Sequence, residues 1–116
     1  MKLREVNNSK IPAMLGACAI TLYPFILFDG EPEPEIIYHE YVHVKQIQRL
    51  GWFKFYYSYI KEYVMLRLRG LSHIEAYYEI SFEKEAFASE DFFAKQGEHA
   101  QKTMLHLVRV VCSARS

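Results

Sequence analysis

Residues 35–50 read EIIYHEYVHVKQIQRL, and this segment sets the architecture expected for the rest of the chain. Its apolar residues recur at the three- and four-residue spacing of a helix with a broad apolar face. An acidic residue stands at its start and Gly51 follows its end, as is common at helix termini. The pattern predicts a helix from about Glu35 to Leu50.

The segment before this helix has the composition of strands. Ala19 to Phe28 reads AITLYPFILF and is rich in β-branched and aromatic residues. It ends at Asp29-Gly30, a dipeptide typical of turns, so we expect one strand or a pair of short strands. Pro24 lacks a backbone N–H, which favours an edge position in the sheet. Pro32 and Pro34 then predict an extended surface loop that leads into the helix.

The remainder of the chain has helical patterns. Residues 52–69 are rich in aromatic side chains and form the first expected helix. Ser72 and Glu75 have the spacing of a capping box, which opens a second helix towards Lys95. Residues 98–112 carry an apolar stripe at helical spacing and form the third.

Together these elements predict an α+β fold, in which a small N-terminal sheet packs on helix 35–50 and about three further helices follow. With 116 residues, the chain has the usual length of one domain. Hydrophobic residues make up 51% of it, which is ample for a core. We therefore assign residues 1–116 to a single domain.

Charge and cysteine content narrow the partners and the compartment. Fourteen basic residues balance fourteen acidic ones, so no electrostatic footprint for nucleic acid exists. The two cysteines, Cys18 and Cys112, are too few for a disulfide scaffold, so we expect free thiols. Free thiols favour the cytoplasm as the location of the protein. Secreted, lipoprotein and phage-associated locations are open alternatives. The uncharged run Ile11 to Phe28 contains two prolines and is barely long enough for a bilayer, so we do not expect a membrane span.

The predicted helix contains His39-Glu40-Tyr41-Val42-His43, which is the pattern H-E-x-x-H. Residues four apart share one face of a helix, so both imidazoles can bind one cation. Glu40 stands beside them and can act as a general base on a metal-bound water. The pattern predicts a Zn²⁺ site with metal ligands His39 and His43.

A catalytic zinc site uses three protein ligands and keeps one open position, so a third ligand must come from elsewhere. The metzincin pattern is excluded, because Gln46 and Arg49 stand where it needs glycine and histidine. The candidates are the carboxylates of the helix predicted after Ser72, with one histidine as an outsider: Glu79, Glu83, Glu85, Glu90 and His73.

Residues 83–88, EKEAFA, resemble the second motif of gluzincins, where a ligand glutamate is followed three residues later by a small residue that faces the metal-binding helix. The resemblance implies Glu83 as the third zinc ligand and Ala86 at the small position. Together with the H-E-x-x-H helix, the resemblance covers roughly Asp29 to Phe93. The chain is similar in size to the minigluzincins, small single-domain metallopeptidases of bacteria and phages. Gluzincins often have an aspartate where Phe87 stands, so the carboxylate that would orient a ligand histidine is unassigned.

The expected function is peptide hydrolysis by a gluzincin-type zinc metalloendopeptidase, with a zinc-activated water and Glu40 as general base. A peptide or protein substrate would pair in extended form with the expected edge strand near Tyr23 to Phe28. A side chain near the ligand helix would donate a hydrogen bond to the oxyanion of the transition state, and the candidates are Tyr77, Tyr78 and His73.

Two alternatives accompany this hypothesis. The first is a catalytically silent zinc-binding structural or interaction module, such as an inhibitor or a phage-assembly component, whose metal supports folding. It predicts that Glu40→Gln is silent and that His43→Ala unfolds the chain. The second keeps the enzyme but makes it latent, with Met104 to Val111 lying over the site as a plug.

Overall fold

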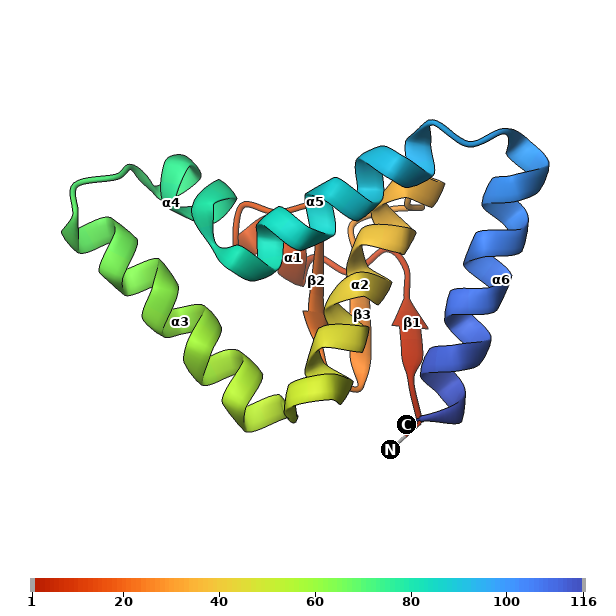
Figure 1. Ribbon diagram of the computed structural model, residues 1–116, viewed down its shortest axis with the longest axis horizontal. Coiled ribbons are helices and arrows are strands. Elements are labelled where there is room, and N and C mark those ends of the chain that lie inside the picture. Colours follow the sequence, from red (N-terminus) through yellow and green to blue (C-terminus); the bar gives the residue numbers. More distant parts are fainter. Residues whose placement is uncertain (1, 116) are drawn as a thin grey trace.

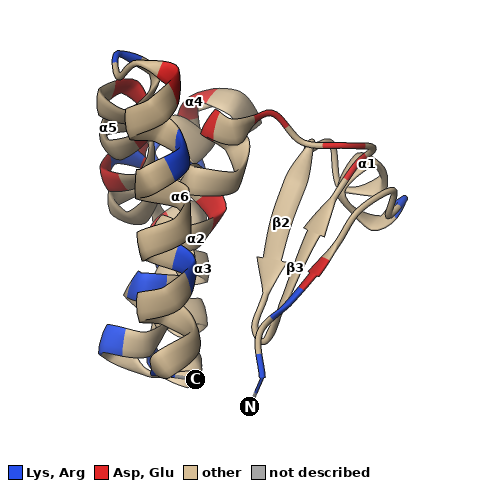
Figure 2. Cartoon of the chain, turned by 90° about the vertical axis from the view of Figure 1, so that its right-hand side faces the viewer, with Lys and Arg blue, Asp and Glu red and all other residues tan. Residues whose placement is uncertain are grey.

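A computed structural model describes residues 2–115 and arranges them as a three-stranded sheet and six helices (Figure 1). Turned by 90°, the sheet forms one layer and the longer helices form the other (Figure 2). The α+β class and the small N-terminal sheet expected from the sequence are confirmed. In chain order the elements are β1 (Arg4–Val6), α1 (Ile11–Met14), β2 (Ala19–Leu22), β3 (Phe25–Phe28), α2 (Pro34–Leu50), α3 (Trp52–Leu68), α4 (His73–Glu79), α5 (Ser81–Ala94) and α6 (Glu98–Ala114).

The sheet has the order β1-β3-β2, with β3 parallel to β1 and antiparallel to β2. The predicted pair of short strands is confirmed, but the expectation of an edge position for Tyr23 to Phe28 is wrong. β1, which the sequence did not predict, pairs with the outer side of β3 and makes it the central strand. Pro24 lies in the turn after a cis peptide bond, where its missing N–H costs no ladder hydrogen bond. The edge strand on this side is β2.

The core forms where the sheet meets α2. Ile26 and Phe28 of β3 are fully buried and pack with Tyr41 and Val44 of α2. Alternation of side chains along β3 sends these two residues to the same face of the sheet. Burial of each such side chain stabilises the fold by about 1.5–3 kcal/mol. This packing fixes the position of α2, the helix that carries the H-E-x-x-H residues.

The second expected helix, from Ser72 to Lys95, is two helices. Its capping box is confirmed, because the Ser72 hydroxyl accepts the Glu75 N–H and the Glu75 carboxylate accepts the Ser72 N–H. At Ile80, however, the backbone is extended, with ψ at 130°, and the side chain is fully buried. Glu62 of α3 then accepts both the N–H and the hydroxyl of Ser81, which satisfies the start of α5.

The C-terminal helix does not cover the predicted metal site, so the plug hypothesis for Met104 to Val111 is wrong. Val108 and Cys112 of α6 belong to the core cluster with Tyr41 and Val44. The Gln48 amide of α2 also donates to the Cys112 carbonyl at 2.8 Å. These α2 residues lie about half a turn around the helix from the two histidines. Helix α6 therefore packs on the opposite side of α2.

The apolar run Ile11 to Phe28 is divided between α1, β2 and β3 and forms no single long helix. Within residues 2–115, none of the helices has both the length and the apolar character needed to cross a bilayer. Cys18 is exposed, Cys112 is buried, and both are free, as the sequence analysis expected.

Glu5 links β1 to α6 through hydrogen bonds that stabilise the fold. Its carboxylate accepts two hydrogen bonds from Arg109, at 2.8 and 3.0 Å, and one from the Tyr41 hydroxyl. Partial burial raises the pKa of Glu5, but the hydrogen bonds from Arg109 and Tyr41 outweigh it and lower the pKa overall. The ionised form is therefore the one that the fold stabilises.

We expect Glu5→Gln to lower the free energy of unfolding at neutral pH, because it removes the charge that pairs with Arg109. The loss should be only about 1 kcal/mol, because this ion pair is partly exposed and screened by solvent. Since the native pKa lies below the unfolded value, this contribution is complete above the unfolded pKa and is lost as pH falls through the native one. Urea unfolding at neutral and acidic pH measures the difference. The exposed Glu31→Gln variant is the control, and an equal deficit of Glu5→Gln at every pH would contradict the assignment.

Candidate metal centre

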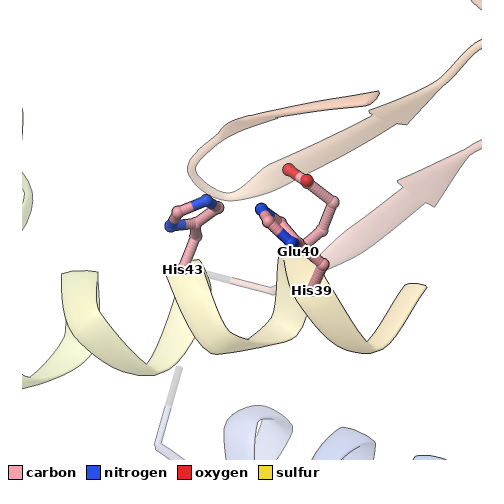
Figure 3. Close-up of side chains that lie close together, drawn as sticks. All are labelled: His39, Glu40 and His43. Atoms are coloured by element: carbon pink, nitrogen blue, oxygen red, sulfur yellow. The ribbon is translucent and has the colours of Figure 1, made fainter. Parts of the chain in front are cut away.

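His39 and His43 project from one face of α2, one turn apart, with ring centroids 5.0 Å from each other. Figure 3 shows the two imidazoles side by side on the helix, with the Glu40 side chain next to His39. Ligand atoms of these three residues lie within 4.8 Å of one another, and each residue is only 4–6% exposed. The spacing of the H-E-x-x-H pattern is thus realised as one buried cluster.

Glu83 of α5 completes this cluster. Its Oε1 lies 3.0 Å from Nε2 of His39 and 3.1 Å from Nε2 of His43. Ligands of a tetrahedral zinc ion, at bond lengths of about 2.0 Å, are separated by about 3.3 Å. Both distances from Oε1 to the imidazole nitrogens are therefore close to the spacing that such an ion requires, and two histidines with one glutamate are a donor set that zinc accepts.

The other carboxylates weighed as third ligands have different partners. Glu79 is exposed and pairs with Lys84 at 2.8 Å. Glu85 accepts a hydrogen bond from the Gln46 amide at 2.7 Å. His73, the outsider, is exposed and lies 2.8 Å from the Tyr63 hydroxyl. Of the candidates on α4 and α5, only Glu83 meets Nε2 of both histidines.

Glu90, also weighed as a ligand, lies behind His39 instead. Its Oε1 is 2.8 Å from Nδ1 of His39, on the opposite side of the ring from Glu83. Glu83 and Glu90 lie two turns apart on one face of α5. Glu83 contacts Nε2 of His39, and Glu90 contacts Nδ1 of the same ring. A carboxylate in this position orients a metal-ligating imidazole and increases its basicity. Glu90 therefore has the position expected for the orienting carboxylate that was unassigned from the sequence.

His43 has an orienting partner on its own helix. Nδ1 of His43 lies 2.8 Å from Oε1 of Gln46, and the Gln46 amide donates to the Phe82 carbonyl at 3.0 Å. In the sequence, Gln46 is notable only as a departure from the metzincin pattern. Its position three residues after His43 was the signal for this contact, since residues at that spacing are neighbours on a helix.

Phe87 occupies the place where gluzincins often have aspartate, and it packs on the site. Its ring contacts that of His39 edge to face, with centroids 4.5 Å apart. Ala86, at the small position, is fully buried. Phe87 therefore contributes an apolar wall beside His39, while Glu90 supplies the carboxylate.

Tyr59 of α3 holds the second oxygen of Glu83. Its hydroxyl donates to Oε2 at 2.6 Å, which leaves Oε1 directed at the two histidines. Burial raises the pKa of Glu83, but hydrogen bonds with His39 and His43 outweigh it and lower the pKa well below its usual range. Burial, together with the negative charge of Glu83, raises the pKa of Tyr59 and keeps its hydroxyl a donor. Sequence reasoning missed Tyr59, because no motif links α3 to α5.

The charge of His43 depends on the same carboxylates. Burial lowers the pKa of His43, but its hydrogen bond with Glu83 and the charges of Glu40 and Glu83 raise it to about 9. A protonated His43 can donate from Nε2 to Glu83. A cation between these groups would take the place of that proton, because metal ligation requires neutral imidazole.

Glu40 faces the sheet, where the Thr21 hydroxyl of β2 donates to its Oε1 at 2.9 Å. Burial raises the pKa of Glu40, and the nearby His43 and His39 only partly offset this effect. A carboxylate with a raised pKa is a better proton acceptor than one in water. Its contact with β2 also places Glu40 between the histidines and the edge of the sheet.

The charges of Glu83 and Glu40 act on Tyr77, one of the three candidates for the oxyanion partner. Burial and the charge of Glu83 raise the pKa of Tyr77, so its hydroxyl stays protonated, and its ring packs on Phe87. Tyr78 is half exposed and also packs on Phe87. His73, held at Tyr63, has no contact with the ligand residues among those described.

Tyr56 of α3 forms hydrogen bonds at the edge strand β2. The Tyr56 hydroxyl donates to the Thr21 carbonyl at 2.9 Å and accepts the Tyr23 N–H at 3.1 Å. The Thr21 carbonyl lies on the side of β2 away from β3, where another strand would pair, whereas the Tyr23 N–H belongs to the turn that follows β2. Thr21 thus links the free edge of the sheet to Glu40.

We compared the chain with protein-family models, with curated protein sequences and with solved structures, and it matches none of them. The geometry of the cluster is therefore the basis on which the function is argued.

Proposed function

We propose that the protein is a zinc-dependent hydrolase of the gluzincin type, a metalloendopeptidase that cleaves peptide bonds. One observation carries the proposal: a single carboxylate oxygen of Glu83 lies within 3.1 Å of Nε2 of both His39 and His43. Two imidazoles on one helix and a carboxylate from another form the ligand set of a catalytic zinc site. Zinc bound there supplies Lewis acidity and lowers the pKa of a water to about 7.

The residues of the chain have separate roles in this proposal. Glu40 accepts the proton of the attacking water and passes it to the leaving amine, for which its buried position and raised pKa are suited. Thr21 fixes the direction of that carboxylate through its hydroxyl. Tyr77, whose ring packs on Phe87 and whose raised pKa keeps its hydroxyl protonated, is the donor assigned to the developing oxyanion in this proposal.

The substrate in this proposal is an extended segment of a peptide or protein. It would add to β2, whose free edge carries the Thr21 carbonyl and leads directly to Glu40. Strand addition uses backbone hydrogen bonds, so it demands an unfolded segment more than a particular side chain. The incoming strand would have to displace the Tyr56 hydroxyl from that edge.

Burial of the cluster favours a second candidate, a catalytically silent zinc module. All four side chains of the cluster are 3–6% exposed, and closed sites are typical of structural zinc. In that case the metal stabilises the packing of α5 on α2 and no water is activated. The two candidates share the metal and differ in the role of Glu40.

Removal and return of the metal test the enzyme proposal. We expect zinc-loaded protein to cleave unfolded casein or an extended peptide mixture, and a strong zinc chelator to abolish cleavage. One equivalent of zinc should restore it, because no other cluster of three ligand residues occurs in residues 2–115. Mass spectrometry of the products measures cleavage. Products that persist under chelation would point to a contaminating protease and contradict the proposal.

We also propose a reducing compartment, the cytoplasm, for this activity. The exposed Cys18 and the buried Cys112 are both free thiols, which persist where disulfides are reduced.

A further inference from the structure

Helix α3 carries a row of large apolar side chains on its outer side. Five residues follow the helical spacing of four, three, four and four positions, and each is 46–78% exposed. In the view of Figure 1, no other element lies outside α3. We call this row the α3 stripe, and its residues are Phe53, Tyr57, Ile60, Val64 and Leu68.

The stripe lies opposite the side on which α3 packs. Phe55 is buried, Tyr59 reaches Glu83, and Glu62 reaches Ser81, so these three mark the inner side of the helix. Each lies roughly half a turn around the helix from the stripe. The stripe is therefore a continuous outer surface, and not part of the core or of the metal centre.

The charges beside the stripe have one sign. Exposed basic side chains flank it along its length and at its C-terminal end, namely Lys54, Lys61, Arg67 and Arg69. The single acidic residue of α3, Glu62, lies on the inner side and is bound to Ser81. The whole chain has no net charge, so the positive charge here is a local property of α3.

We propose that the α3 stripe binds the surface of an anionic lipid membrane. A helix with an aromatic and aliphatic face bordered by Lys and Arg lies in the plane of the bilayer interface, with its apolar side among the headgroups and its cations on the phosphates. Trp52, which starts the helix and contacts Phe53, belongs to the residue type that prefers this interface. The proposal concerns peripheral binding and is independent of the metal centre.

Charge complementarity selects lipid over a second copy of the chain. Two copies that paired through their stripes would bring the basic flanks of both helices together, where like charges repel. An anionic surface instead offers counter-charges to all four cations. Self-association is the competing outcome, and the experiment distinguishes it.

The sole tryptophan provides a built-in reporter, because Trp52 is 58% exposed and lies next to the stripe. We expect its fluorescence to shift to shorter wavelength with vesicles of phosphatidylglycerol and phosphatidylcholine. Vesicles of phosphatidylcholine alone should give a much weaker shift, and added salt should reduce binding. Co-sedimentation with the vesicles measures the bound fraction.

Paired variants locate the surface. Lys54→Gln with Lys61→Gln should weaken binding to the anionic vesicles about 30-fold, since each cation near such a surface contributes about 1 kcal/mol. Lys95→Gln with Lys102→Gln, on exposed positions outside α3, is the matched control and should bind like wild type. Ile60→Asn should weaken binding as well, whereas Val110→Asn on α6, similarly exposed, should not.

Two results would overturn the proposal. One is the absence of binding to anionic vesicles by folded wild-type protein, with circular dichroism as the check on folding. The other is a tryptophan shift that appears without lipid, rises with protein concentration and disappears in Ile60→Asn, because the stripe would then be a contact between copies. Neither result bears on zinc binding or peptide cleavage.

Discussion

Zinc-loaded Glu40→Gln is expected to lose peptide hydrolysis by about 10²–10⁴-fold while it keeps its zinc, because the substitution removes a general base and no metal ligand. The amide has the shape of the carboxylate, and its oxygen can still accept the Thr21 hydroxyl, so the fold should be preserved. Cleavage rate and zinc content, measured on one preparation, give the result. The expectation rests on the position of Glu40 between the histidines and β2.

Glu33→Gln is the matched control, since Glu33 is exposed at the start of α2 and its side chain forms no capping hydrogen bond. It should cleave like wild type. Full activity in Glu40→Gln would remove Glu40 from the mechanism. If wild type and Glu40→Gln both bind zinc and neither cleaves, the silent zinc module becomes the better description.

The second large effect is expected for Glu83→Gln, which should lower zinc affinity by more than about 100-fold. Loss of a residue that only orients a ligand typically costs 10- to 100-fold, and the loss of a ligand should exceed this. Competition with a chromophoric chelator measures the affinity. The neutral amide keeps the size of the side chain, so the packing of α5 on α2 should survive.

Glu79→Gln serves as the control on the same region of the chain, because Glu79 is exposed and its partner is Lys84. Its zinc affinity should equal that of wild type. An unchanged affinity in Glu83→Gln would mean that the third ligand lies elsewhere. Equal losses in both variants would indicate a general effect of charge and not ligation.

Much of the fold could be predicted, because its main elements carry local signals. The period of residues 35–50 and the prolines before them define α2, and the composition of residues 19–28 defines the hairpin. β1 could not be predicted, since Arg4–Val6 is only three residues long and all three are exposed, so it shows no alternation. The break at Ile80 has neither glycine nor proline, and it depends on Glu62 from another helix.

The contacts of the site also fall into those that the sequence could predict and those that it could not. Contacts within one helix follow from spacing, which is how the sequence indicates His39 with His43 and, in hindsight, Gln46 with His43. Contacts between elements depend on how those elements pack, and no residue pattern encodes that. Tyr59 on Glu83 and Thr21 on Glu40 are of this second kind. The packing of the folded chain brings them to the site.

The Tyr56 hydroxyl at the edge of β2 has a consequence for which chains can pair with this strand. An unprotected edge would invite any exposed strand, including those of other copies, and so promote aggregation. The Tyr56 phenol satisfies the Thr21 carbonyl on this edge and the Tyr23 N–H in the adjoining turn, so another chain gains little from a single backbone contact. Only a segment long enough to offer several consecutive hydrogen bonds can compete. In the proposed peptidase, this edge would therefore favour long, unfolded segments over folded proteins and short peptides.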